Sequence, residues 1–572
     1  MPTVNQTVRI QPGQRQKYRL SIGRAPVVMA VLGMTTGAMA AVVVIGLRLL
    51  YEAGQRTLLP DGQLGGFEGL PAWLRLVLPI TGAVLIGLYM QYAARLDPRT
   101  GIGFVIERTA YHEALLPVRN AAHQFMAATL AIVTGHSVGR EGPSVHLGAT
   151  AGSQLGQWLR LPHNSLRTLV ACGTAAAIGA SFNTPLAGVA FAMEVVVMEY
   201  TIAGFLPVII ASVTATALAQ VVFGAEIAFS IPALSLEGLH ELPLVSVLGL
   251  LLGGLAAAFI RLLRHSAHFL PTASPVSRTA LGGAIVGGIA LFVPQVMGIG
   301  YDTISATLAG EIGVTLLLTI VVAKLLATAA IIGLGVPGGL IGPTLVMGAA
   351  AGAAGGLLAE ALIPVPLGGV ALYALLGMGA MMGATLRAPL AALTAMLELT
   401  ANPGIIMPGM LAIAAATISA RELFGTDSVY HLELGARGLD PRQNPLLQAA
   451  SRLGILQLID TRWRILPTPA AASVADTPSS AAAGWVLHTP GEDGLPTRAL
   501  ADTTLAANRA AGRPVLSESI TLRPIDENAS LREALERLRQ ADADAALLVT
   551  HGQARHCRGI VTRQAIHHAY LD

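Results

Sequence analysis

Two stretches of the chain, GPSVHLGATAG at residues 142–152 and GPTLVMGAAAG at residues 342–352, repeat one pattern 200 residues apart. They agree at every Gly, Pro and Ala of the pattern but one. A second pair, TPLAG at residues 184–188 and APLAA at residues 388–392, follows at an offset of 204 residues. Because nearly the same spacing holds at two places, the sequence predicts a duplicated domain.

The composition places this domain in a membrane. Of 572 residues, 53% are hydrophobic and 12% are charged, about half the charged fraction of a soluble chain. A bilayer-spanning helix needs about 20 mostly apolar residues, and such stretches recur along the chain, which excludes a secreted, fibrous or freely soluble protein. The predicted helices lie near residues 27–50, 72–95, 121–135, 143–160, 166–180, 185–199, 203–223, 243–264, 276–294, 314–333, 343–362, 368–383, 388–400 and 405–424.

Several of these helices are short, and Gly and Pro clusters at residues 135–143 and 333–343 interrupt the apolar sequence. Broken backbone is tolerated in a bilayer only where it is buried in protein or lines a cavity. Interrupted segments in corresponding halves indicate a transporter-type site near the membrane midplane, and such repeats are commonly inverted. We therefore predict an all-α polytopic membrane domain over residues 26–436, with broken and re-entrant helices and inverted repeat halves at about 27–223 and 243–430.

Two charged regions flank the membrane domain. Residues 1–25 are basic and contain no acid, which predicts a cytoplasmic arm. The last 136 residues hold 29 of the 69 charged residues, whereas the first 436 hold 40. Residues 437–572 are therefore predicted to be a smaller cytoplasmic α/β region. Within it, Ser530 and Glu533 have the spacing of a capping box that opens a helix, and two short strands are expected after that helix.

Charge and cysteine content exclude other classes of protein. The formal net charge of +3 is too small to indicate a nucleic-acid partner. Cys172 and Cys557 are 385 residues apart and give neither a disulfide framework nor a metal-ligand spacing. No cofactor and no metal is expected.

The segment GREGP at residues 139–143 predicts an anion site. A Gly-rich break with Pro near the first turn of the next helix leaves backbone N–H groups and the positive end of the helix dipole facing the break. Its repeat partner, GVPGGLIGP at residues 335–343, has the same design, so two helix N-termini can converge on one anion. Glu141 places a carboxylate at this site; apolar surroundings favour its protonated form, so it can leave or take up a proton. The alternatives are a structural salt bridge for Glu141, and pairing with an acid or an interfacial position for Arg140.

The same region contains GHSVG at residues 135–139, which is formally a serine nucleophile elbow. Such an elbow follows a β-strand and requires a later acid and His, whereas Ser137 follows an apolar helix. An intramembrane serine hydrolase that uses Ser137 is therefore only a remote alternative, and the sequence predicts no enzyme.

Four motifs follow one another along the chain: GREGP at residues 139–143, SFNTPLAG at 181–188, GGLIGP at 338–343 and RAPL at 387–390. In this order and spacing they resemble the CLC family of chloride channels and chloride/proton exchangers. The resemblance covers about residues 27–436 and implies a homodimer in the lipid bilayer, in a bacterial inner membrane with both termini cytoplasmic. Residues 520–572 are similar to the CBS domains that follow many CLC membrane domains.

The resemblance also implies roles for individual residues. Glu141 matches the family's gating glutamate, which leaves its chloride site when it is protonated. The stretch RTGIG at residues 99–103 departs from the family's GSGIP at Arg99 and Gly103, and helix capping is the alternative role for Thr100. The implied anion-binding positions are loop residues Gly139, Arg140 and Gly142, the backbone amides of Leu340 and Ile341, and the hydroxyls of Thr100 and Tyr430.

Val195 is an informative departure from the family pattern. The typical exchanger has a second glutamate here, which passes protons between the cytoplasm and the gate, whereas many channel members have Val. Glu194 or Glu199 could substitute through water, although each is more typical of a helix end or interface. The sequence therefore favours a passive chloride channel gated by protonation of Glu141, with chloride/proton antiport as the alternative.

Overall fold

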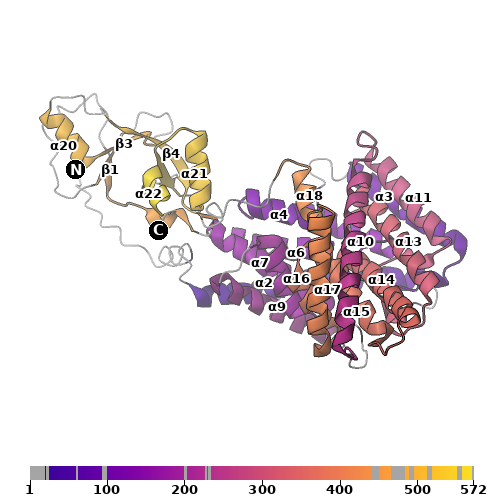
Figure 1. Ribbon diagram of the computed structural model, residues 1–572. Helices are drawn as coiled ribbons and strands as arrows, with labels where there is room; N and C mark the ends of the chain where they lie inside the picture. The colour runs from indigo at the N-terminus through magenta and orange to yellow at the C-terminus, as the bar shows by residue number, and fades with distance from the viewer. Residues whose placement is uncertain are drawn as a thin grey trace. The chain divides into compact units, whose positions relative to one another are not determined.

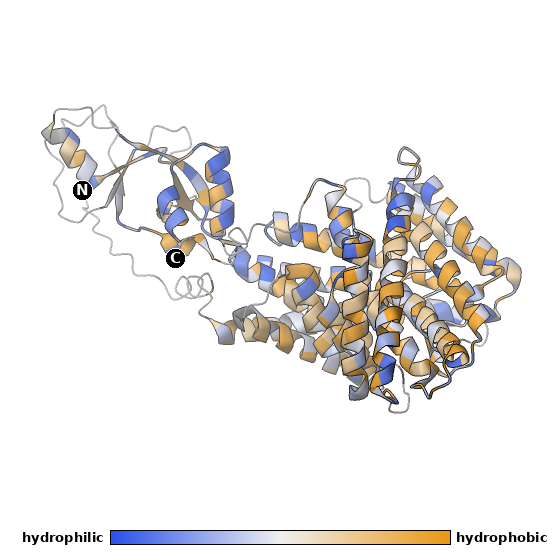
Figure 2. Cartoon of the chain, viewed as in Figure 1, coloured by the Kyte–Doolittle hydropathy of each residue, from blue (hydrophilic) through white to orange (hydrophobic). Residues whose placement is uncertain are grey.

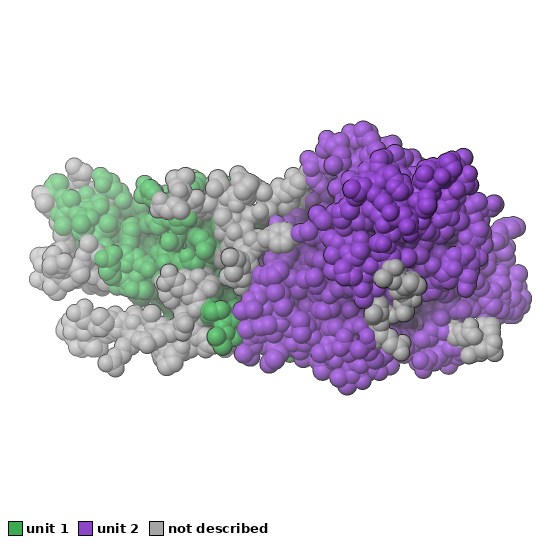
Figure 3. All heavy atoms as spheres, turned by 60° about the horizontal axis from the view of Figure 1, so that its bottom comes forward, with its two compact units in different colours: residues 1–29, 156–166, 442–572 green, residues 30–155, 167–441 purple. Residues whose placement is uncertain are grey.

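A computed structural model gives the fold, and the chain divides into two compact units (Figure 3). The larger unit comprises residues 30–155 and 167–441, and the smaller comprises residues 1–29, 156–166 and 442–572. The predicted N-terminal arm, apart from residues 20 and 25, and Glu199 lie outside the described residues. The structure describes residues 20, 25–59, 62, 64–92, 99–198, 202–225, 229, 234–439, 450–451, 453–465, 484–488, 495–511, 518–550 and 557–569.

The membrane domain is built from apolar helices (Figures 1 and 2). Within the described residues, nine helical segments are long and apolar enough to cross a bilayer. The α-helices of this domain are α2 (Pro26–Leu58), α3 (Ala72–Tyr92), α4 (Gly101–Tyr111), α5 (Val118–Val133), α6 (Glu141–Trp158), α7 (His163–Phe182), α8 (Pro185–Phe191), α9 (Ile202–Phe223), α10 (Leu242–His268), α11 (Pro275–Ala290), α12 (Tyr301–Leu308), α13 (Val314–Gly333), α14 (Ile341–Leu362), α15 (Gly369–Leu386), α16 (Pro389–Thr400), α17 (Ile406–Ile418) and α18 (Val429–Gly435).

Every predicted apolar stretch overlaps one of these helices, so the predicted all-α membrane fold is confirmed. Three short helices, α4, α12 and α18, were not predicted, because their apolar runs are too short to show a helical period. Helix α6 begins at Glu141, two residues before its predicted start. This difference matters because Glu141 itself becomes the first residue of a helix.

Glycine pairs let the helices of each half approach very closely. In the first half, a Cβ on Gly173 of α7 would overlap the backbone carbonyl of Gly148 in α6. In the second half, a Cβ on Gly377 of α15 would overlap the carbonyl of Gly348 in α14. The repeated Gly of the sequence pattern therefore serves the same backbone contact in both halves.

A reciprocal capping arrangement ties the two halves together. Glu194 of the first half accepts hydrogen bonds from the backbone N–H groups of Leu390 and Ala391, at 3.1 and 2.8 Å, in the first turn of α16. Its repeat partner, Glu398, accepts hydrogen bonds at 2.8 and 2.7 Å from the second and third residues of α8. A carboxylate at a helix N-terminus satisfies free donors and complements the dipole. The exchange of equivalent contacts shows that the halves are related by a local two-fold arrangement.

The C-terminal region has an α/β fold, as predicted. Its strands form a sheet in the order β1-β2-β3-β4-β5-β6, in which the β1–β2 and β4–β5 pairs are parallel and the other neighbours are antiparallel. The capping box is confirmed: the Ser530 hydroxyl accepts from the Glu533 N–H, and the Glu533 carboxylate accepts from the Ser530 N–H, both at 3.2 Å. The elements are β1 (Trp463–Ile465), β2 (Trp485–His488), β3 (Arg498–Ala501), α20 (Asp502–Ala510), β4 (Ile520–Asp526), α21 (Leu531–Gln540), β5 (Ala545–Val549), β6 (Cys557–Thr562) and α22 (Arg563–His568).

We predict that Gly377→Ala destabilises the membrane domain. The added methyl group would meet the Gly348 carbonyl, and overpacking of this kind costs about 1–3 kcal/mol. Gly288→Ala is the matched control, because a Cβ at this helical position meets no atom within 4 Å. Thermal unfolding of the purified protein in detergent should show a lower midpoint for Gly377→Ala alone. Equal midpoints for the two variants would contradict the packing argument.

Candidate functional site

The two Gly-rich breaks of the repeat pair with each other. The Gly139 N–H donates to the Gly339 carbonyl at 2.8 Å, and the Gly339 N–H donates to the Gly139 carbonyl at 2.7 Å. This antiparallel bridge joins two residues that occupy the same position in the two repeats. Helix α6 starts two residues after one bridge residue, and α14 starts two residues after the other. The bridge therefore brings two helix N-termini together, as the sequence predicts.

Glu141 occupies the N-terminus of the opposite half's helix. Its side chain is fully buried, and its Oε1 accepts a hydrogen bond from the Gly342 N–H at 2.5 Å. The backbone N–H of Ile341 also stabilises this carboxylate, whereas its Oε2 has no hydrogen-bond partner. The start of α14 thus holds a negatively charged group, which is the behaviour expected of an anion site at a helix N-terminus.

Two glycines leave the space that this carboxylate occupies. A Cβ on Gly139 or on Gly339 would overlap a Glu141 carboxylate oxygen. A Cβ on Gly142 would come within 2.8 Å of the Gly338 carbonyl oxygen. The glycines of both breaks are therefore required by the close approach of the two loops and of Glu141.

The sequence predicts Arg140 as an anion-binding loop residue, but its side chain makes other contacts. Its guanidinium donates to the Tyr51 hydroxyl at 2.8 Å and stacks 4.9 Å above the ring of Phe182. No ion pair within 4.0 Å joins Arg140 to Glu141, so a structural salt bridge does not explain Glu141. Arg140 acts on Glu141 through its charge, and its side chain does not line the cavity described next.

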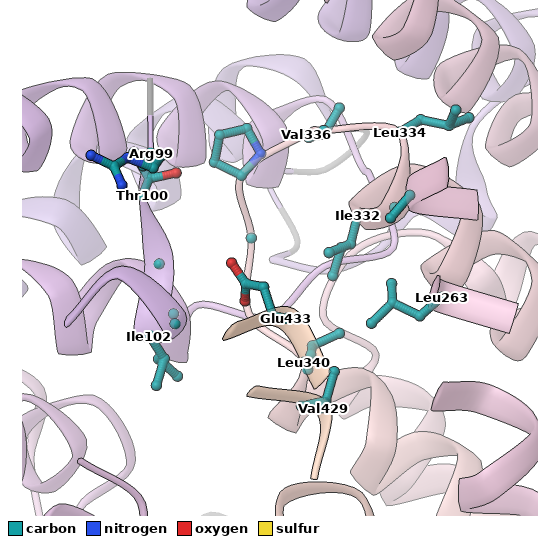
Figure 4. A pocket seen from close by; sticks show the side chains of 18 of the residues that line it. Arg99, Thr100, Ile102, Leu263, Ile332, Leu334, Val336, Leu340, Val429 and Glu433 are labelled. Carbon is teal, nitrogen blue, oxygen red and sulfur yellow. The ribbon is translucent and has the colours of Figure 1, made fainter. Parts of the chain in front are cut away.

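A cavity of about 620 Å³ lies beside the two loops (Figure 4). It brings together Thr100, Gly142, Leu340 and Tyr430 from four separate parts of the chain. Thr100 precedes α4 but makes no capping hydrogen bond, so the alternative role of helix cap does not hold for its side chain. The Tyr430 hydroxyl is buried without a hydrogen-bond partner. Hydroxyls and backbone amides of this kind bind an anion by partial charges, which lets it leave again.

Most of the charged side chains that line this cavity are basic. The lining includes arginines from helices α10 and α11 and from two segments beside α4 and α18, namely Arg264, Arg278, Arg99 and Arg437, together with His268. A cleft lined mainly by one sign of charge raises the local concentration of ions of the opposite sign. The charge therefore favours the entry of anions, while the hydroxyls and amides expected to bind them are uncharged.

Val195 and its neighbour Glu194 do not supply a proton carrier. Val195 is 4% exposed and lies in the π-helical segment η3 (Ala192–Val197), which packs against α4. Both carboxylate oxygens of Glu194 accept hydrogen bonds from the N-terminus of α16. The geometry therefore does not support Glu194 as a replacement for the proton-relay glutamate, whose position Val195 occupies in this chain.

Two further site residues were not identified from the sequence. His146 in α6 accepts a hydrogen bond at 3.2 Å from the Gly101 N–H, which fixes the start of α4 next to Thr100. Glu433 lines the cavity one helical turn after Tyr430 (Figure 4). The i, i+3 spacing from Tyr430 to Glu433 puts both on one helix face, but this signal requires knowing that α18 is a helix.

The serine hydrolase alternative is not supported. The Ser137 hydroxyl forms a hydrogen bond of 2.8 Å with the hydroxyl of Thr328, and neither residue can act as a general base. The segment also follows helix α5 rather than a strand.

The sequence matches the family described as voltage gated chloride channel over residues 81–421, which is more than half of the chain. The chain belongs to this family. It is 34% identical over 376 residues to a putative chloride channel protein ClcB-like of Ralstonia nicotianae, covering 65% of this chain and 87% of the relative. It is 30% identical over 380 residues to an H⁺/Cl⁻ exchange transporter ClcA of Vibrio cholerae, covering 64% and 80%.

Solved structures agree with this assignment. The fold is similar to that of a slow cyanobacterial Cl⁻/H⁺ antiporter, with a TM-score of 0.63 and 23% identity, over 72% of this chain and 97% of that chain. It is also similar to a CLC-type fluoride/proton antiporter, with a TM-score of 0.58 and 25% identity, over 71% and 96%. The chain is thus a multi-pass membrane protein of the CLC family that transports anions.

We predict that Tyr430→Phe weakens chloride binding. The change removes the buried hydroxyl that has no protein partner, and a hydrogen bond to a charged group contributes about 1.5–3 kcal/mol. The dissociation constant measured by calorimetry should rise about tenfold or more. An unchanged constant in a variant that elutes as the folded protein would show that the hydroxyl does not contact the anion.

Proposed function

We propose that this CLC protein exchanges chloride for protons, with Glu141 as the group that takes up the proton. The observation that carries this proposal is the position of the Glu141 carboxylate at the N-terminus of α14, where it accepts the hydrogen bond from Gly342. Ionised, the carboxylate competes with chloride for these donors. Protonated, it loses its charge and leaves them to the anion.

The relatives support coupling to protons. The Vibrio cholerae relative is named an H⁺/Cl⁻ exchange transporter, and two similar solved structures are of antiporters. Chloride would be held by the backbone N–H groups of Leu340 and Ile341 and by the hydroxyls of Thr100 and Tyr430. Gly139 and Gly142 shape the loop around it, and Arg140 contributes its charge from a distance.

A passive chloride channel is the second candidate. The resemblance to the family places a second glutamate where this chain has buried Val195, and Glu194 is held by α16. The Ralstonia relative is named as a putative chloride channel.

We also propose the arrangement of the protein in its membrane. The arginines that line the cavity favour a cytoplasmic location for the cavity, because basic residues are retained on that side. The termini would then be cytoplasmic, in the inner membrane of a bacterium. The protein would act as a homodimer, as the resemblance implies, without a cofactor or a metal.

We predict that a chloride gradient drives protons in the opposite direction in proteoliposomes that contain this protein. Glu141→Gln should abolish the coupled proton movement while chloride movement continues, because glutamine cannot carry a proton. Chloride flux and external pH are recorded together. A wild-type reversal potential equal to the chloride potential would select the passive channel instead, and the absence of any chloride flux would contradict both candidates.

A further inference from the structure

Glu433 places a carboxylate in the wall of the anion cavity, at a position that the mechanism above does not use. It belongs to α18, which is not one of the helices able to span the membrane. Its side chain is 40% accessible, because it faces the cavity, and Figure 4 shows it between Thr100 and Leu340. Negative charge here opposes the anion that the surrounding arginines attract.

The sequence around α4 is adapted to this carboxylate. A Cβ on Gly103 would overlap the Glu433 Oε2, so a side chain at position 103 would displace it. Gly103 is one of the positions at which residues 99–103 depart from the family's pattern, which has Pro there. The departure therefore creates the space that Glu433 fills.

The second departure, Arg99, belongs to the same network. Arg99 pairs with Glu107 at 2.6 Å, Glu107 pairs with Arg437 at 2.9 Å, and Arg437 pairs with the Glu433 Oε1 at 3.0 Å. Two arginines and two carboxylates thus alternate along one chain of contacts. This network holds the Glu433 carboxylate at the cavity wall.

An independent observation also indicates a ligand in the cavity beside Glu433. Tyr430, one helical turn earlier, has a buried hydroxyl without a hydrogen-bond partner. The charges of both Glu433 and Glu141 act on this hydroxyl. An anion held by Tyr430 would therefore be subject to the charge of both carboxylates.

We propose that Glu433 is a second proton-binding gate, whose ionised carboxylate opposes the passage of anions through the cavity and whose protonated form admits them. The proposal rests on the proposed anion pathway and extends it with a gate in addition to Glu141.

The surroundings of Glu433 set the direction of its response to pH. Desolvation by the surrounding protein raises the pKa of Glu433 above its ordinary value, the charge of Arg437 opposes the shift, and the carboxylate of Glu107 adds to it. The ionised fraction therefore falls as the pH is lowered from neutral, and anion flux rises. Helix α15, which also packs on α18, contains no charged residue. The other charged or titratable groups that face the cavity are Arg99, Arg264, His268, Arg278 and Arg437.

The test uses the Glu141→Gln background, in which the other gate cannot titrate. Chloride efflux from proteoliposomes with the same pH on both sides should rise as the pH falls, by up to about tenfold per pH unit above the pKa of Glu433. In Glu141→Gln/Glu433→Gln the efflux should be high and nearly independent of pH. The control is Glu141→Gln/Glu422→Gln, which removes an exposed carboxylate outside the cavity and should keep the pH response.

Gly103→Ala in the same background gives an independent variant. It keeps Glu433 ionisable but displaces its carboxylate, so the pH response should weaken. The proposal is overturned if Glu141→Gln efflux is flat across this pH range, or if the Glu433→Gln variant keeps the full response. Wild-type chloride flux, measured in parallel, separates these outcomes from a failure of the proposed function.

Discussion

The pair of backbone hydrogen bonds between Gly139 and Gly339 is the constraint on which the rest of the membrane domain depends. Each break exposes backbone donors and acceptors inside the membrane domain, where unpaired groups are costly. At the bridge, the backbone groups of the two breaks form hydrogen bonds with each other. The helices that follow begin within two residues of it. The donors left over at Ile341 and Gly342 are held where the two halves meet, and they face the carboxylate of Glu141.

The side chains that attract anions over a distance differ from the groups expected to bind them. The arginines line the cavity, and their long-range attraction acts on anions before they bind. Arg140 belongs to one of the binding loops, but its guanidinium contacts Tyr51 and Phe182. Binding is left to amides and hydroxyls, whose weaker attraction permits release. The same separation lets a single carboxylate, such as Glu141, change the electrostatics of the site by gaining or losing one proton.

Much of the architecture could be predicted because it depends on local pattern. Apolar runs identify the long helices, and the Ser530–Glu533 spacing identifies the start of α21. The three unpredicted helices are short, and two of them, α4 and α18, line the cavity. Their helical character depends on packing against the longer helices rather than on an apolar period of their own. For this reason Glu433 and the contact of His146 with α4 were not found from the sequence.

The sequence by itself determined that this is a duplicated membrane protein with two glycine-rich breaks, one of which carries Glu141. These properties follow from composition, from spacing and from the helix termini that such breaks expose. Only the tertiary structure decided that Glu194 caps the other half's helix, that Arg140 turns away, and that Gly103 makes room for Glu433. Each of these contacts joins residues far apart in the chain, and only the packing of the helices brings such residues within bonding distance.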